Sequence, residues 1–280
     1  MLNKLLLTLK LMRADKPVAY LLVFFPALFG LLLANPSNTA LAHLLPLFIL
    51  GSITTRSSGC IVNDVFDRKF DKHVARTKDR PLASGALSVS YAIFILFILS
   101  IISLFILLLL SKTAIYTGFF AVIMISIYPL MKRITYFPQI FMGFTFKLGA
   151  LIAYAAVQDK LDVAAIIMYL ACCSWATGYD TIYGFMDIKD DKKIGVKSLS
   201  VYLESKHYKF WLYICYIGFT LLFILATKIA NHNINYLPIL AALILLILQV
   251  ATLDIQNPAN CMTRFRANNY VGILLSLTFY

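Results

Sequence analysis

Aspartate residues gather in two short segments of this 280-residue chain. The first segment, NDVFDRKFD at 63–71, places Asn63, Asp67 and Asp71 four residues apart, with Asp64 three residues before Asp67. On an α-helix this spacing puts the side chains along one face. Like charges one turn apart repel each other, and a divalent cation relieves that repulsion. The segment therefore predicts a cation-binding face at the end of a helix.

The second segment, YDTIYGFMDIKDD at 179–191, repeats the pattern with Tyr183, Asp187 and Asp191, and Asp180 lies one turn before Tyr183. Mg²⁺ accepts one or two protein carboxylates and fills its remaining positions with water and phosphate oxygens. Two carboxylate sets that face each other would hold metal ions on both sides of a diphosphate. The alternative is that the carboxylates are solvated and paired with nearby Lys and Arg. The matched spacing of the two segments favours the metal–diphosphate site.

Basic residues follow both segments and have a matching use. Arg76 and Arg80 come after the first segment, Lys197 comes after the second, and Lys132 and Arg133 end an apolar stretch between them. Arginine binds phosphate or carboxylate through a bidentate fork, and lysine acts as a mobile point charge. We expect Arg76, Arg80 and Lys197 to contact a diphosphate. The simpler explanation for each of them is the usual excess of basic residues in cytoplasmic loops.

The elements that must position these residues are membrane helices. The chain is 61% hydrophobic and only 14% charged, which is too apolar for an ordinary soluble domain. Apolar stretches of about 20 residues, the length that crosses a bilayer, recur along it. The predicted class is all-α and polytopic, with about nine transmembrane helices around a central cavity. The predicted spans are 18–34, 41–62, 88–110, 114–131, 138–157, 163–183, 210–228, 236–253 and 268–280.

The distribution of Lys and Arg predicts the orientation of these spans. If the N-terminus is cytoplasmic, 20 of the 25 basic residues fall in cytoplasmic segments, three fall outside (Lys112, Lys160 and Lys228), and Arg56 and Lys147 lie within spans. This asymmetry is the one expected when basic loops stay in the cytoplasm. It also explains the net charge of +12 without nucleic acid, since no soluble segment interleaves basic residues with aromatics. Both aspartate segments then face the cytoplasm.

The chain is predicted to form one membrane-embedded domain over residues 1–280. Asp67 and Asp71 recur 120 residues later as Asp187 and Asp191, with four spans between them, which favours two four-helix halves in parallel orientation plus a final helix. The five cysteines match no zinc-binding spacing and are expected to fill the core. The basic N-terminal segment has no small-residue cleavage site and is expected to be retained.

These motifs together resemble those of the UbiA-type membrane prenyltransferases. The resemblance rests on NDVFDRKFD, RTKDRPLASG, YPLMKR and YDTIYGFMDIKDDKKIGVKS, and extends from RADKP at 13–17 to NNYVG at 268–272. The form of the second motif is similar to that of the 4-hydroxybenzoate polyprenyltransferase branch of ubiquinone synthesis. The main departure is Leu199–Ser200, where the family commonly has Thr–Ala, and it removes no metal ligand.

The resemblance implies Mg²⁺-dependent transfer of a polyprenyl chain from its diphosphate to 4-hydroxybenzoate, by a helical fold around a cavity open to lipid. By position it makes Asn63, Asp67 and Asp71 the first metal–diphosphate motif and Asp187 and Asp191 the second. It gives Arg133 a role in substrate binding, and we expect Arg133 or Arg13 to hold the carboxylate of the acceptor. Further binding contacts are expected from residues around the motifs: Asp64, Arg76, Arg80, Asp180, Tyr183 and Lys197.

Two alternatives remain at this stage. The same fold could prenylate another acceptor, namely haem, homogentisate or a naphthoate. An ion or solute transporter is disfavoured, because little charge lies along the spans beyond Arg56 and Lys147. The expected location is a bacterial inner membrane, with the site on the cytoplasmic face. Neither the length of the prenyl chain nor the oligomeric state follows from the sequence.

Overall fold

The computed structural model describes residues 2–15, 17–74, 77–195 and 197–280, and within these ranges every regular element is helical. This confirms the expected all-α class. The elements in chain order are α1 (Leu2–Met12), α2 (Val18–Leu33), α3 (Asn38–Asp71), α4 (Val89–Leu108), α5 (Lys112–Ile134), α6 (Pro138–Phe146), α7 (Gly149–Gln158), α8 (Val163–Gly184), η1 (Phe185–Asp187), α9 (Ile188–Ile194), α10 (Leu199–Leu203), α11 (Tyr208–Ile229), α12 (Tyr236–Ala251), α13 (Pro258–Ser276) and η2 (Leu277–Phe279).

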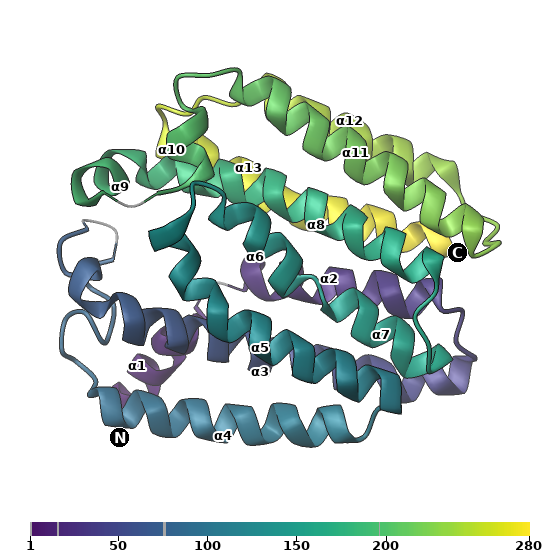
Figure 1. Ribbon diagram of the computed structural model, residues 1–280, viewed down its shortest axis with the longest axis horizontal. Coiled ribbons are helices and arrows are strands. Elements are labelled where there is room, and N and C mark those ends of the chain that lie inside the picture. Colours follow the sequence, from purple (N-terminus) through teal and green to yellow (C-terminus); the bar gives the residue numbers. More distant parts are fainter. Residues whose placement is uncertain (1, 16, 75–76, 196) are drawn as a thin grey trace.

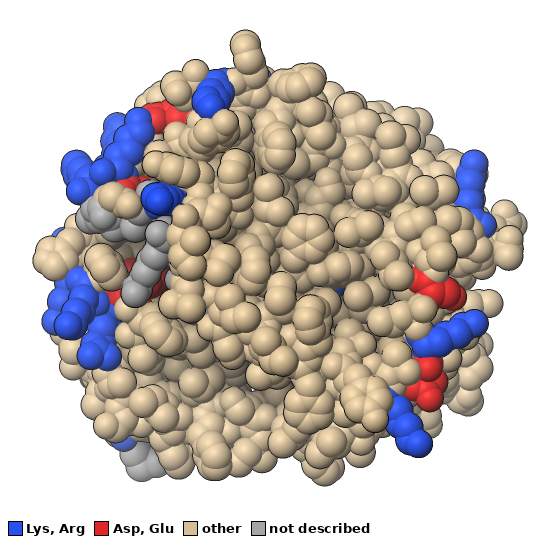
Figure 2. Space-filling model, viewed as in Figure 1, with Lys and Arg blue, Asp and Glu red and all other residues tan. Residues whose placement is uncertain are grey.

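The long helices run side by side and give the molecule two ends (Figure 1). On the face shown in Figure 2, Lys, Arg, Asp and Glu lie at these ends and leave an uncharged belt between them. Within the described ranges, five helical stretches are long and apolar enough to cross a membrane: 38–71, 89–108, 138–158, 163–193 and 208–229. Three further apolar helices are shorter, at 18–33, 112–128 and 236–251. The chain is a multi-pass membrane protein.

Two predicted spans differ from the helices that form. The last helix, α13, begins at Pro258 and not at residue 268, because Asn257 caps it by accepting from the backbone N–H groups of Ala259 and Asn260. Its first turns carry polar side chains that a search for apolar stretches passes over. The span predicted at 138–157 is interrupted at Lys147 and Leu148, between α6 and α7.

This interruption places a lysine where a proline leaves a carbonyl free. Pro26 lies inside α2 and has no N–H to donate to the carbonyl of Leu22, four residues earlier. The Lys147 Nζ donates to that carbonyl oxygen at 2.7 Å, and the lysine is almost fully buried. The lysine thus replaces the missing backbone donor. The helix break and the proline are two parts of one packing arrangement.

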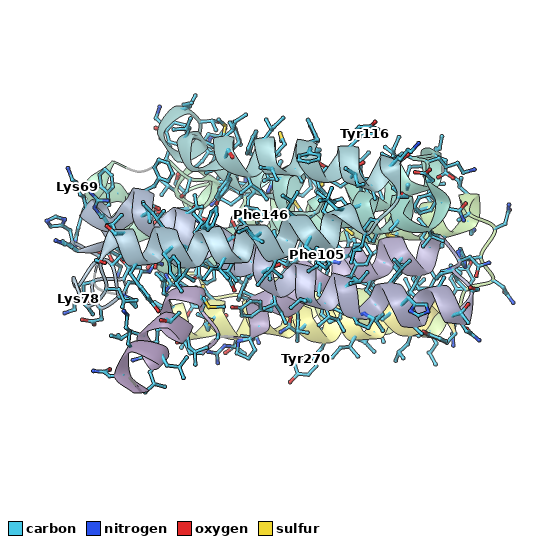
Figure 3. All side chains as sticks on the ribbon, turned by 90° about the horizontal axis from the view of Figure 1, so that it is seen from below. Lys69, Lys78, Phe105, Tyr116, Phe146 and Tyr270 are labelled. Atoms are coloured by element: carbon cyan, nitrogen blue, oxygen red, sulfur yellow. The ribbon has the colours of Figure 1, made fainter. Side chains whose placement is uncertain are left out.

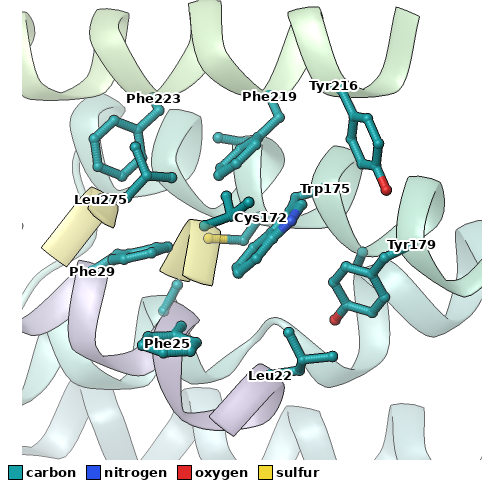
Figure 4. Packing of buried hydrophobic residues seen from close by; sticks show 14 of the residues in the cluster. Leu22, Phe25, Phe29, Cys172, Trp175, Tyr179, Tyr216, Phe219, Phe223 and Leu275 are labelled. Atoms are coloured by element: carbon teal, nitrogen blue, oxygen red, sulfur yellow. The ribbon is translucent and has the colours of Figure 1, made fainter. Parts of the chain in front are cut away.

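The main core forms around α8, which packs most extensively against α11 (Figure 4). The rings of Trp175 and Phe219 stack with centroids 5.1 Å apart, and Phe29 of α2 contacts Trp175 from another side. The indole Nε1 of Trp175 donates to Asn268 Oδ1 of α13 at 2.7 Å. Gly30 lets α2 approach α7 so closely that a Cβ there would collide with the Ala150 carbonyl. These contacts fix the helix whose end carries the second aspartate motif.

Candidate active site

The first aspartate motif occupies the last turns of α3. This helix begins at the Ser37 cap, whose hydroxyl accepts from the Ala40 N–H, and continues 34 residues to Asp71. The helix therefore passes beyond its apolar part and carries the motif to one end of the bundle, where Figure 3 shows Lys69 and Lys78. Asp64 and Asp71 are buried, and Asn63 and Asp67 are half-buried.

Asp64 is held by an arginine from far along the chain. Arg13 Nη2 donates to Asp64 Oδ1 at 2.7 Å and to Oδ2 at 2.9 Å. Arg13 follows α1 with a left-handed backbone (φ 65°), and its Nη1 donates to the Lys10 carbonyl. The Tyr20 hydroxyl donates to the neighbouring Met12 carbonyl at 2.7 Å. These hydrogen bonds hold the chain at Met12 and Arg13, so that the Arg13 guanidinium contacts Asp64.

A second arginine bridges two aspartates of the motif. Arg80 Nη1 donates to Asp64 Oδ1 at 3.2 Å and to Asp71 Oδ2 at 2.8 Å. The segment that carries Arg80 is anchored by buried Leu82, and the Thr77 hydroxyl donates to the Asp71 carbonyl at 3.1 Å. Arg13 and Arg80 together supply two positive charges to the two buried carboxylates. This part of the site is therefore electrically balanced by the chain's own residues.

The second motif does not continue α8 as one regular helix. After Gly184 the chain makes the 3₁₀ turn η1, which ends at Asp187, before α9 carries Asp190 and Asp191. The four-residue spacing of Tyr183, Asp187 and Asp191 therefore runs from α8 through this 3₁₀ turn into α9. The Ser200 hydroxyl donates to the Thr181 carbonyl at 2.9 Å where the ladder of α8 ends. A side chain bonded into the ladder is a usual cause of such a change.

The loop with Lys197 is fixed from the other side by α6. The backbone N–H of Leu199 donates to Gln139 Oε1 at 2.9 Å, and Gln139 is buried. The Lys197 ammonium lies 5.4 Å from the centre of the Tyr136 ring. The Leu199–Ser200 pair thus has a structural role, because its backbone and hydroxyl attach the loop to α6 and α8.

Arg56 and Lys147, which the sequence shows only as single charges within spans, lie near polar residues of α8. Arg56 of α3 interacts electrostatically with Asp180 and Tyr183 of α8, and its buried Nε has no hydrogen-bond partner among the described residues. Lys147 lies 5.3 Å from the centre of the Tyr179 ring. Charged residues at membrane depth usually mark a functional site. Arg56 could have been found by that rule, since it lies two helical turns before Asn63.

The remaining expected site residues are placed as follows. Tyr183 is half-buried, and its ring packs against Phe265 of α13 with centroids 4.8 Å apart. Arg76 and the side chain of Arg133 lie outside the described residues. Figure 1 shows α9 and the segment after α3 at the same end of the bundle, which we call the motif end. The two motifs therefore share one end, as the sequence predicts.

The donors at the motif end fit Mg²⁺ bound together with a phosphate compound. Among the described residues, no three Asp, Glu, His or Cys side chains lie close enough to hold a metal ion by themselves. Mg²⁺ does not need such a cluster, because it binds through one or two carboxylates and phosphate oxygens. The carboxylates of Asp67, Asp71, Asp187 and Asp191 and the amide oxygen of Asn63 are all oxygen ligands of the kind this hard cation prefers.

Comparison with known proteins identifies the family. Residues 23–272 match the UbiA prenyltransferase family. The chain belongs to this family. A UbiA prenyltransferase with these two motifs is an enzyme that transfers prenyl groups, and this excludes the transporter alternative.

Curated relatives and solved structures agree with this assignment. The 4-hydroxybenzoate octaprenyltransferase of Francisella tularensis subsp. novicida (strain U112) is 34% identical over 265 residues, covering 95% of this chain and 93% of that protein. The mitochondrial 4-hydroxybenzoate polyprenyltransferase of Caenorhabditis elegans is 39% identical, covering 95% and 76% respectively. In structure, the apo UbiA homolog of Aeropyrum pernix K1 matches with a TM-score of 0.76 at 22% identity, covering 92% of this chain and 96% of that one.

A second solved structure was determined with ligands. The UbiA homolog of Archaeoglobus fulgidus bound to GPP and Mg²⁺ matches with a TM-score of 0.67 at 18% identity, covering 96% of this chain and 99% of that one. At this identity the match shows that the two chains share a fold.

Proposed function

We propose that this prenyltransferase moves a polyprenyl chain from polyprenyl diphosphate to the aromatic ring of 4-hydroxybenzoate, with Mg²⁺, in ubiquinone biosynthesis. The proposal rests on the position of both aspartate motifs at one end of the bundle, where Arg80 is hydrogen-bonded to the first motif. The names of the curated relatives support the acceptor, and the GPP and Mg²⁺ of the Archaeoglobus fulgidus homolog support the donor and the metal.

In this proposal the residues of the motif end share the binding of the diphosphate. Asn63, Asp67 and Asp71 act from α3, and Asp187 and Asp191 act from η1 and α9. Bound Mg²⁺ would neutralise the charge that develops on the diphosphate as it leaves. Arg76, Arg80 and Lys197 would donate to phosphate oxygens. Because the described carboxylates form no ready cluster, we expect metal and diphosphate to bind together.

Asp64 has a different task from the other aspartates of its motif. Its two oxygens are occupied by Arg13 and Arg80, and it is 1% exposed, which leaves little access for a metal ion. We assign it the positioning of these arginines. We assign the contact with the diphosphate to Arg80. Its hydrogen bonds to Asp64 and Asp71 both come from Nη1, and its side chain is 22% exposed.

The acceptor needs a cation for its carboxylate. Arg13 is bound to Asp64 through both carboxylate oxygens, so it is not available for this role. Arg56 is half-buried, its Nε is buried without a hydrogen-bond partner among the described residues, and it interacts electrostatically with Asp180 and Tyr183. We therefore propose Arg133 and Arg56 for the acceptor carboxylate, with Asp180 and Tyr183 as neighbouring contacts.

The reaction then follows from the positions of these groups. The bond between the prenyl carbon and the diphosphate oxygen breaks, giving an allylic cation. The ring carbon next to the acceptor hydroxyl forms a carbon–carbon bond to it, and a carboxylate or the released diphosphate takes the ring proton. Water must be kept out, because it would capture the cation. The ring of Tyr183 has a face that could stabilise the cation.

We further propose that residues 1–280 act as one domain in a bacterial inner membrane, with the motif end in the cytoplasm. The deciding experiment incubates membranes containing the chain with radiolabelled 4-hydroxybenzoate, a polyprenyl diphosphate and Mg²⁺, and measures label in the lipid fraction. Labelled lipid that disappears with EDTA supports the proposal. In parallel reactions with radiolabelled homogentisate, naphthoate or haem in place of 4-hydroxybenzoate, labelled lipid from one of these and none from 4-hydroxybenzoate would overturn the acceptor assignment.

A further inference from the structure

Lys147 is a buried charged residue that the proposed reaction does not use. It lies at the break between α6 and α7 and is 1% exposed. Figure 3 shows Phe146, the residue before it, in the middle part of the bundle, between the two ends of the molecule. The Lys147 ammonium contacts the Leu22 carbonyl at 2.7 Å and lies 5.3 Å from the centre of the Tyr179 ring. Both of these partners are uncharged.

The hydrogen bond to Leu22 does not by itself explain why the residue is charged. The Leu22 carbonyl needs one donor, and a neutral amide side chain would supply it. A charge at membrane depth costs free energy that a neutral donor does not cost, and charged residues kept there usually have a function. An ammonium also has three N–H groups, of which one donates to the Leu22 carbonyl. We therefore looked for a use of the charge itself.

The charges around Lys147 leave an excess of positive charge. Lys147 interacts electrostatically with Arg56 of α3 and Asp180 of α8, and these two residues also interact with each other. The neighbouring thiols of Cys172 and Cys173 are of a type that is uncharged at neutral pH. Two cations and one carboxylate therefore come together from three helical segments. A net positive charge inside the bundle stabilises an anion that binds there.

The depth of these charges fits the carboxylate of an aromatic acid better than a diphosphate. Arg56 lies seven residues before Asn63, and Tyr179 lies eight residues before Asp187. At the rise of a helix these separations place the charges about 10–12 Å below the two motifs. In 4-hydroxybenzoate the carboxylate lies across the ring from the hydroxyl. The carbon beside the hydroxyl can then face the prenyl diphosphate while the carboxylate points inward.

We infer that Lys147 is a positioning residue for the acceptor, whose carboxylate its charge stabilises while Arg56 makes the contact. The inference rests on the proposed function, because it takes 4-hydroxybenzoate as the acceptor. Lys147 acts through its charge and not by contact, since its side chain is covered by the Leu22 carbonyl and the Tyr179 ring. The same lysine thus completes α2 and adds to the affinity for the acceptor.

The test is steady-state prenyl transfer, with 4-hydroxybenzoate and the polyprenyl diphosphate varied in turn. Lys147→Gln keeps an N–H donor and removes the charge. We expect it to raise KM for 4-hydroxybenzoate about tenfold, the order expected for one charge roughly 10 Å away at an effective dielectric constant of about 20. The value of kcat and KM for the diphosphate should change little. Lys160→Gln is the matched control, because it removes an exposed lysine in the loop between α7 and α8 and should leave KM unchanged.

A Pro26→Ala background separates the charge from the hydrogen bond. Alanine at this position supplies the N–H that the Leu22 carbonyl lacks, so a purely structural role of Lys147 disappears there. We expect Lys147→Gln to raise KM for 4-hydroxybenzoate by the same factor in this background. Loss of the effect with Pro26→Ala would show that Lys147 only completes the helix, and this would overturn the inference.

The other outcomes also decide. An unchanged KM for 4-hydroxybenzoate in Lys147→Gln, or an equal rise in Lys160→Gln, would overturn the inference and leave the proposed function intact. A rise in KM for the diphosphate instead would show that the charge serves that substrate. Absence of transfer to 4-hydroxybenzoate by the unaltered chain would refute the proposed function, and the inference with it.

Discussion

Replacing Asp64 by Asn tests whether this carboxylate positions Arg13 and Arg80 or binds the metal ion. The substitution keeps the shape of the side chain and one acceptor oxygen but removes the charge that two arginines share. Arg13 and Arg80 make three hydrogen bonds to this carboxylate, at 2.7, 2.9 and 3.2 Å. The side chains of the two arginines are 16% and 22% exposed, so each regains some hydration when the charge is lost.

The magnitude follows from these contacts. A hydrogen bond to a charged group contributes about 1.5–3 kcal/mol, and the partial exposure of the arginines argues for the lower figure. If Arg80 loses its orientation, one such bond to the diphosphate is lost, which corresponds to roughly tenfold in kcat/KM for polyprenyl diphosphate. The concentration of Mg²⁺ needed for half-maximal rate should stay unchanged, because Asp64 does not touch the metal.

The assay is prenyl transfer by membranes carrying each variant, with the diphosphate and Mg²⁺ varied in turn. Asp67→Asn is the matched control, because it makes the same chemical change on the same helix at a proposed ligand, and it should raise the Mg²⁺ requirement. Asp64→Glu should recover part of the rate. A raised Mg²⁺ requirement in Asp64→Asn, equal to that of Asp67→Asn, would make Asp64 a ligand and refute the reasoning.

Three further predictions concern catalysis, packing and pH. Asp187→Ala should abolish prenyl transfer, while western blots of carbonate-washed membranes show normal insertion; near-normal turnover with ample Mg²⁺ would remove Asp187 from the ligands. Lys147→Met should lower the free energy of unfolding in detergent by about 1–3 kcal/mol, because it leaves the Leu22 carbonyl without a donor. In a Pro26→Ala background the same change should lower the free energy of unfolding clearly less. Equal losses in both backgrounds would contradict the pairing of Lys147 with Pro26. The exposed carboxyl of Asp159 has a pKa held below its usual 3.8, first by a hydrogen bond from the Thr113 N–H. Its contribution to stability is therefore present above pH 3.8 and lost as the pH falls through the lower pKa of the folded state. Asp159→Asn should flatten the pH dependence of the melting temperature in that range. An unchanged profile would contradict this role of Asp159.

The sequence predicted the long helices well, because apolar length is a strong signal and basic loops separate the spans. It also predicted that both motifs reach one end of the bundle, since an even number of spans lies between them. The interruption at Lys147 was not predictable in this way. It depends on a carbonyl 125 residues earlier that Pro26 leaves free, and no local pattern links the two.

The candidate site was likewise predicted from the sequence only in part. Spacing identified Asp67 and Asp71, but it could not show that Asp64 and Asp71 share Arg80 or that Arg13 reaches Asp64 across 51 residues. Periodicity also missed the 3₁₀ turn η1, which lies where the Ser200 hydroxyl donates to a carbonyl 19 residues earlier in the chain. Interactions between distant residues decide which carboxylate oxygens are bonded to Arg13 and Arg80.

The position of Arg13 bears on how the chain can be handled. The arginine lies directly after α1, and Figure 1 shows the C-terminus at the opposite end of the bundle. A shortened version that lacks the first thirteen residues would keep every apolar span yet lose one of the two arginines that neutralise the first motif. Affinity tags therefore belong on the side of Tyr280. Reporter fusions there and before α1 should also fall on opposite faces of the bilayer, because a chain whose ends lie apart crosses it an odd number of times.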